Sequence, residues 1–159
     1  MKRLPAYAVL LPLLLLNALC WPYLPAAYQP EVFLDGVPTW ITLPETIGRV
    51  VVFGLPVVMH LRLRRSPAST ALLCVGVLIY TASWAAQILL PDSAWSTSLV
   101  GFTAPAWTPA LWLAGLSLTG DFYGRKIRYN PLYYGIPSLF FLCAHVGHAT
   151  WVWWSVFGG

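Results

Sequence analysis

The sequence predicts an all-α integral membrane protein, a single domain built as a bundle of five transmembrane helices. Hydrophobic residues make up 58% of the 159 residues and charged residues only 9%, against roughly 25% charged in an ordinary soluble domain. So few charges cannot keep a folded surface in contact with water, so most of that surface must face lipid. The chain is also tryptophan-rich, with nine Trp, and such rings favour the two membrane interfaces.

Five apolar segments are each long enough to cross a bilayer. We predict spans at residues 4–21, 43–63, 69–90, 98–118 and 131–154, with a long extracytoplasmic loop at 22–41.

Two of these spans have special features. The first resembles a signal peptide, but Leu19 precedes Cys20 where a lipoprotein cleavage site needs a small residue, so we expect this span to be retained. The fourth contains Pro105 and Pro109. Because proline removes a backbone hydrogen bond, we expect a kink or local unwinding there.

The basic residues predict the orientation. Eight of the nine Lys and Arg fall on one side of the predicted spans, and the ninth, Arg49, lies within a span. Positive residues collect on the cytoplasmic side of membrane proteins. We therefore predict a plasma (inner) membrane protein with its N-terminus in the cytoplasm and its C-terminus outside. The eight residues are Lys2, Arg3, Arg62, Arg64, Arg65, Arg125, Lys126 and Arg128.

Several chemistries are not expected. The net charge of +4 follows from the basic cytoplasmic loops, so we expect no nucleic-acid partner. The three cysteines are far apart and form no CxxC pair, so the sequence supports neither a zinc site nor a thiol-redox pair. We assign no catalytic residue and no metal ligand, and the sequence identifies no cofactor.

Polar side chains concentrate in the outer half of the predicted bundle. Glu45 and Arg49 are four residues apart, and His145 and His148 three apart, so each pair shares one helix face. A charged side chain in lipid costs about 2.5–3.5 kcal/mol on insertion scales, so these groups should turn inward and pair. We therefore predict a polar pocket that opens toward the outside.

Tryptophans are expected to surround this pocket, namely Trp40, Trp84, Trp95 and Trp107. Gln87 lies on the same face of the third span as Trp84, one turn away. The candidate ligand-binding residues are Glu45, Arg49, Trp84, Gln87, Trp107, His145 and His148. A purely structural interpretation stays open, in which Glu45 and Arg49 form an ion pair at a helix end and the histidines only satisfy hydrogen bonds.

Two short segments resemble motifs of a known family. The segment from Pro44 to Arg49 and the segment from Phe141 to His145 resemble fragments of the motifs of CAAX-type intramembrane proteases. The resemblance implies Glu45 as a water-activating base and His145 as an oxyanion stabiliser. Only one glutamate stands where that family has two, so we assign no family.

Two function classes follow. The favoured one is a non-enzymatic membrane subunit, or a binder of a small or lipid-like ligand through the aromatic-rimmed pocket, because the loops are short and few side chains are chemically competent. The alternative is an intramembrane enzyme or metal-binding protein built on Glu45, Arg49, His145 and His148. The expected partners are membrane lipid, other membrane subunits or further copies of the chain.

Overall fold

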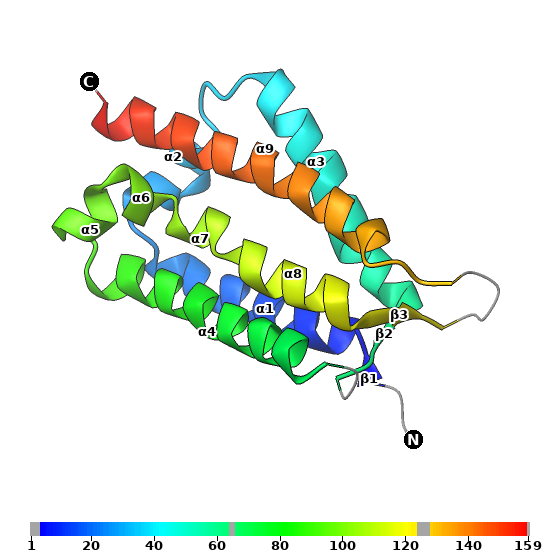
Figure 1. The fold of residues 1–159 in the computed structure, drawn as a ribbon. Coiled ribbons are helices and arrows are strands. Elements are labelled where there is room, and N and C mark those ends of the chain that lie inside the picture. The colour runs from blue at the N-terminus through cyan, green and yellow to red at the C-terminus, as the bar shows by residue number, and fades with distance from the viewer. Residues whose placement is uncertain (1–3, 64–65, 124–127, 159) are drawn as a thin grey trace.

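The computed structural model describes residues 4–63, 66–123 and 128–158, and it confirms the prediction of an all-helical bundle (Figure 1). The longer helices are α1 (Tyr7–Cys20), α3 (Thr39–Gly54), α4 (Pro67–Leu89), α8 (Pro109–Thr119) and α9 (Leu132–Phe157). The short helices are α2 (Pro30–Phe33), α5 (Ala94–Thr97), α6 (Leu99–Phe102) and α7 (Ala104–Trp107). Turns of 3₁₀ helix cover Trp21–Tyr23, Ala26–Tyr28 and Leu55–Val58.

The bundle consists of two closely packed helix pairs. Helix α4 packs along α8, and α3 packs along α9 (Figure 1). The contact between α8 and α9 joins the two pairs, and α1 lies against α4. Helices from distant parts of the sequence therefore meet at the centre of the molecule.

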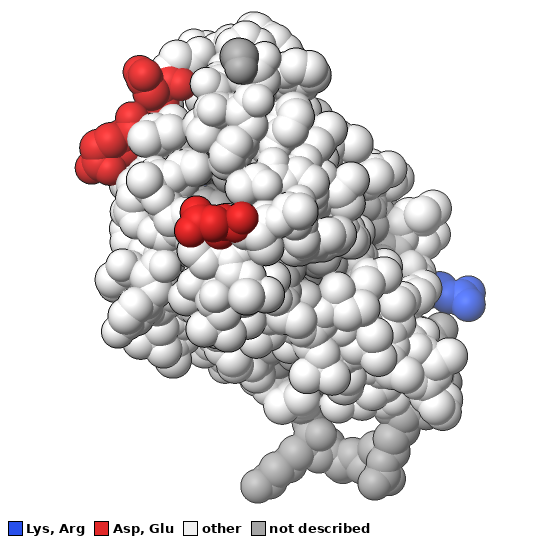
Figure 2. Space-filling model, turned by 90° about the vertical axis from the view of Figure 1, so that its left-hand side faces the viewer, with Lys and Arg blue, Asp and Glu red and all other residues white. Residues whose placement is uncertain are grey.

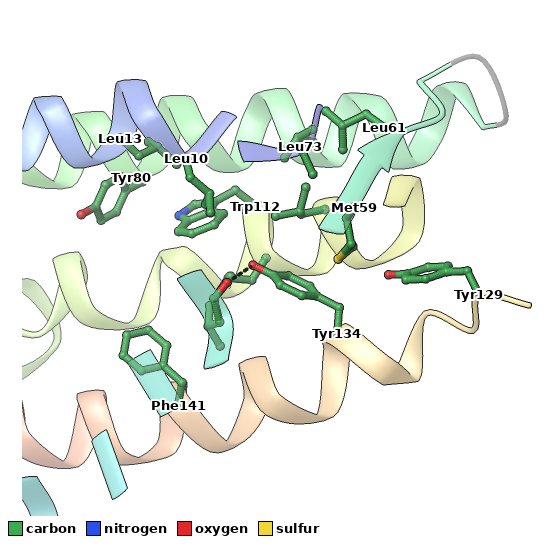
Figure 3. Close-up of a cluster of buried hydrophobic side chains, with 14 residues drawn as sticks. Leu10, Leu13, Met59, Leu61, Leu73, Tyr80, Trp112, Tyr129, Tyr134 and Phe141 are labelled. Atoms are coloured by element: carbon green, nitrogen blue, oxygen red, sulfur yellow. Dashed lines mark hydrogen bonds between the residues drawn. The ribbon is translucent and has the colours of Figure 1, made fainter. Parts of the chain in front are cut away.

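The centre is filled by one cluster of buried side chains from all of these helices, shown in Figure 3. Five of its fourteen members are aromatic, and Trp112 and Tyr134 are almost fully buried. Its members are Ala6, Leu10, Leu13, Val52, Met59, Leu61, Leu73, Tyr80, Trp112, Leu113, Leu116, Tyr129, Tyr134 and Phe141.

A small antiparallel sheet closes one end of the bundle, and the sequence analysis did not predict it. Its order is β1 (Leu4–Pro5), β2 (Met59–Leu61) and β3 (Gly120–Phe122). The Arg62 guanidinium lies 2.6 Å from the Asp121 carboxylate beside these strands. The sheet therefore ties the first described residues to the ends of the α3 and α8 segments.

The helices support only part of the five-span prediction. Within the described residues, two helices are long and apolar enough to cross a membrane, Thr39–Val58 and Pro67–Leu89. The first predicted span forms a shorter apolar helix, Tyr7–Tyr23. The segment 98–118 is divided into α6, α7 and α8, because Pro105 and Pro109 interrupt the backbone ladder.

The predicted fifth span forms the 26-residue α9. It has the length of a span, but its polar and aromatic residues lower its mean hydropathy. It is therefore not one of the two helices that are apolar enough to cross a membrane. The five-span bundle and its orientation are therefore not supported by helix length and hydropathy. The orientation also depended on six basic residues that lie outside the described part of the chain, namely Lys2, Arg3, Arg64, Arg65, Arg125 and Lys126.

Side chains replace the backbone donors that two prolines remove. Pro56 has no N–H for the carbonyl of Val52, four residues earlier, and the Tyr134 hydroxyl donates to that carbonyl at 3.2 Å (Figure 3). Pro105 likewise leaves the carbonyl of Gly101 without a backbone donor. This carbonyl accepts a hydrogen bond from Nε2 of Gln87 at 2.7 Å. These bonds allow broken helices to stay buried.

Gln87→Leu should lower the free energy of unfolding by about 1–3 kcal/mol, because it leaves the Gly101 carbonyl buried without its donor. Denaturation in detergent measures this loss. In a Pro105→Ala background the same substitution should cost less, since the new backbone N–H of residue 105 can donate to the carbonyl. An equal cost in both backgrounds would contradict this role of Gln87.

Candidate functional site

Helices α3 and α9 approach closely at Gly48. A Cβ added to Gly48 would lie 2.9 Å from the Cα of Phe141, so only glycine allows this spacing. Glu45 lies one turn before Gly48 on α3, and His145 lies one turn after Phe141 on α9. The close approach therefore brings Glu45 within reach of the histidines of α9.

Glu45 is the centre of the polar cluster that results. Its side chain is 4% exposed, and its Oε1 accepts a hydrogen bond from the Arg49 guanidinium. Nδ1 of His145 lies 2.9 Å from the same oxygen. Nδ1 of His148 lies 2.5 Å from the other oxygen, Oε2. Both carboxylate oxygens are thus occupied.

The second nitrogen of His148 determines how many protons the cluster holds. Its Nε2 lies 2.8 Å from the carbonyl oxygen of Phe33, which can only accept, so Nε2 carries a hydrogen. The contact between Nδ1 and Glu45 then needs one further proton, placed on either partner. The pair of Glu45 and His148 is therefore neutral overall, as imidazolium and carboxylate or as imidazole and carboxylic acid.

A cavity of about 440 Å³ lies against this cluster, within the size range of small-molecule sites. Its walls are mostly apolar, with nine aromatic residues, and come from α1, α3, α4, the broken α6–α8 segment, α9 and the segment between α1 and α3. The aromatic lining residues are Trp21, Tyr28, Phe33, Phe53, Tyr80, Trp84, Phe102, Trp112 and Phe141. Its exposed lining residues are Leu14 of α1, Thr46 and Arg49 of α3, and Trp21 and Leu34 of the segment between these helices. The cavity therefore reaches the surface along α1 and α3 and beside that segment.

The segment between α1 and α3 also lines the cavity, through Trp21, Leu24, Tyr28, Pro30, Phe33 and Leu34. The Tyr28 hydroxyl donates a hydrogen bond to the carbonyl of Phe102 at 2.6 Å. The carbonyl of Phe33 accepts the hydrogen bond from Nε2 of His148. The Tyr28 ring also stacks on Phe102, with 4.6 Å between ring centres. Burial raises the pKa of Tyr28 well above its usual value, so the hydroxyl remains a donor.

The polar atoms inside the cavity are mainly hydrogen-bond donors. The indole N–H of Trp112 is buried and has no hydrogen-bond partner among the described residues. The Tyr80 hydroxyl donates to Oδ1 of Asn17 at 2.6 Å, which leaves the amide N–H groups of Asn17 available. In Figure 3 the Trp112 nitrogen and the Tyr80 hydroxyl both point to the left, away from Met59 and Tyr129.

The structure places five of the seven candidate residues at this cavity, namely Glu45, Arg49, Trp84, His145 and His148. The other two lie elsewhere. The Gln87 amide donates to the carbonyl of Gly101, and the Trp107 indole donates to the carbonyl of Val100 at 3.1 Å.

The four tryptophans expected at the rim are also divided. Only Trp84 lines the cavity. Trp40 lines a second, more apolar cavity of about 610 Å³ on the outer side of α3 and α9, where it meets Trp151 edge-on. Trp95 and Trp107 line neither of these two cavities.

Sequence reasoning missed Trp112 and Phe141 as parts of the site. One signal could have identified Trp112, because it lies in the middle of a predicted span, away from the interfaces where Trp usually collects.

Among the described residues, no group of three His, Cys, Asp or Glu is arranged to hold a metal ion. Comparisons with protein-family models, curated protein sequences and solved structures each found no match.

Proposed function

We propose that this chain is a membrane-embedded binding protein whose aromatic cavity takes a small or lipid-like ligand. The observation that carries the proposal is the cavity of about 440 Å³, which combines apolar aromatic walls with the buried cluster around Glu45. Ligand sites in proteins share this design, in which a few polar groups orient a ligand held by apolar walls.

The outward faces of the helices support a membrane location. On α9, Leu132, Ile136, Leu139 and Phe140 are each at least half exposed and form one stripe at helical spacing. At 1.5 Å per residue, α9 is about 39 Å long, enough to cross a hydrocarbon core of about 30 Å. We propose that α1, α3, α4, the α6–α8 segment and α9 all cross the bilayer.

The charges support the proposed orientation. Figure 2 views the end of the molecule where α5 and the end of α9 lie, and acidic side chains gather on it. The exposed acids of the loops at this end are Glu31, Asp35 and Asp92. The exposed basic residues Arg62 and Arg128 lie near β2 and the start of α9, at the opposite end. We propose that this basic end faces the cytoplasm.

Blocking the cavity mouth tests the proposal. Protein purified in mild detergent should carry a bound molecule that native mass spectrometry detects as added mass. Thr46→Trp should remove that mass, because the new ring enters the cavity edge from an exposed position. Val50→Trp is the matched control, since Val50 is 68% exposed on the same helix and does not line the cavity.

Retention of the mass in Thr46→Trp would contradict the proposal. So would a wild-type protein that carries no ligand and takes none up from an extract of membrane lipids.

A further inference from the structure

We infer that the ligand is an amphipathic anion, with a carboxylate or phosphate head group bound beside Arg49 and an apolar part on the aromatic wall. This inference rests on the proposed function and specifies the chemical class of the ligand. Three properties of the cavity carry it, namely the charge of its cluster, the kind of hydrogen-bonding groups left available, and the position of its edge.

The first property is the charge. Glu45 and His148 together are neutral, because Nε2 of His148 must donate to Phe33 and one proton is shared with Glu45. Arg49 adds one positive charge. Glu45, His148 and Arg49 together therefore carry a net charge of +1 whichever partner holds the shared proton. In a low-dielectric surrounding, one positive charge is best balanced by one negative charge on the ligand.

The second property is the hydrogen-bonding groups. The carboxylate of Glu45 already contacts Arg49, His145 and His148, so it has little capacity left to accept from a cationic head group. Most of the available groups are donors. They are the further N–H groups of the Arg49 guanidinium, whose side chain is 55% exposed, the amide of Asn17 and the buried indole of Trp112.

The third property is the position of the opening. Arg49 lies in the middle of α3, between the lining residues Thr46 and Phe53. The exposed lining residue Leu14 belongs to the middle of α1. An opening between the middles of two proposed spans faces the bilayer interior, so a lipid anion can enter sideways. The walls formed by Tyr80, Trp84 and Phe141 then receive its chain.

Four probes with the same dodecyl chain test this inference on delipidated protein in nanodiscs, namely dodecanoate, dodecyl phosphate, dodecanol and dodecylamine. We expect the two anions to bind at least about tenfold more tightly than the alcohol and the amine, which corresponds to about 1.4 kcal/mol. The comparison of dodecanoate with dodecyl phosphate distinguishes the two head groups. A cluster of charge +1 favours the singly charged carboxylate.

Arg49→Gln should weaken binding of the anions about tenfold and leave dodecanol unchanged. Arg62→Gln is the control, because Arg62 is similarly exposed but pairs with Asp121 at the other end of the bundle. Equal binding of alcohol and anion, or no effect of Arg49→Gln, would overturn the inference while the proposed binding function stands. Failure of all four probes to bind would overturn both.

Discussion

Glu45→Leu should lower the free energy of unfolding by about 3–5 kcal/mol, the usual loss when one partner of a buried ionic cluster is removed. The leucine leaves Nδ1 of His148 buried without a partner, since the ring is 2% exposed and Nε2 stays bound to Phe33. Reversible denaturation in detergent measures the loss.

Glu45→Gln separates hydrogen bonding from charge at the same position. An amide can accept from Arg49 through its oxygen and donate to Nδ1 of a neutral His148 through its nitrogen. The cluster keeps its charge of +1 in this variant. We therefore expect Glu45→Gln to cost only about 1 kcal/mol, and to retain the preference for an anionic ligand. Equal losses in the leucine and glutamine variants would show that the hydrogen bonds of Glu45 contribute nothing.

A double-mutant cycle tests the link between α3 and α9. Glu45→Leu and His148→Leu together should cost less than the sum of the single changes, by about 1–3 kcal/mol, because the double variant leaves neither polar partner behind. Strictly additive losses would show that the two residues do not interact. Arg49→Gln should cost about 1 kcal/mol or less, since its side chain is more than half exposed.

Gly76→Val and Gly115→Val should each lower the free energy of unfolding by about 3 kcal/mol, at the upper end of typical overpacking. A Cβ on Gly76 would lie 2.4 Å from the backbone nitrogen of Trp112, and a Cβ on Gly115 would lie 2.5 Å from that of Leu73. Backbone atoms cannot move away as a flexible side chain can, so α4 and α8 must separate.

Gly147→Ala is the matched control for this prediction. No atom lies within 4 Å of a Cβ built on Gly147, and alanine favours a helix over glycine by roughly 0.5–1 kcal/mol. This variant should therefore be neutral or slightly more stable. The separation of α4 and α8 should also displace Trp112, so the valine variants should lose the bound ligand. Valine variants as stable as Gly147→Ala would contradict the packing of α4 against α8.

The sequence by itself determined the helical class and the polar pairs. The apolar segments predicted a helical bundle, and the spacing of Glu45 with Arg49 and of His145 with His148 placed each pair on one helix face. Pro105 and Pro109 also predicted the interruption that divides the segment 98–118. These features are local, because they depend on residue type and on spacing within one helix.

Only the tertiary structure decided which pairs meet. Glu45 and His148 are 103 residues apart, and their contact depends on the close approach of α3 and α9 at Gly48. The role of Gln87 depends on the carbonyl that Pro105 frees on another helix. The three-stranded sheet joins segments too short to show a periodicity of their own. Such contacts are set by the packing of helix against helix, which the order of residues along one helix does not encode.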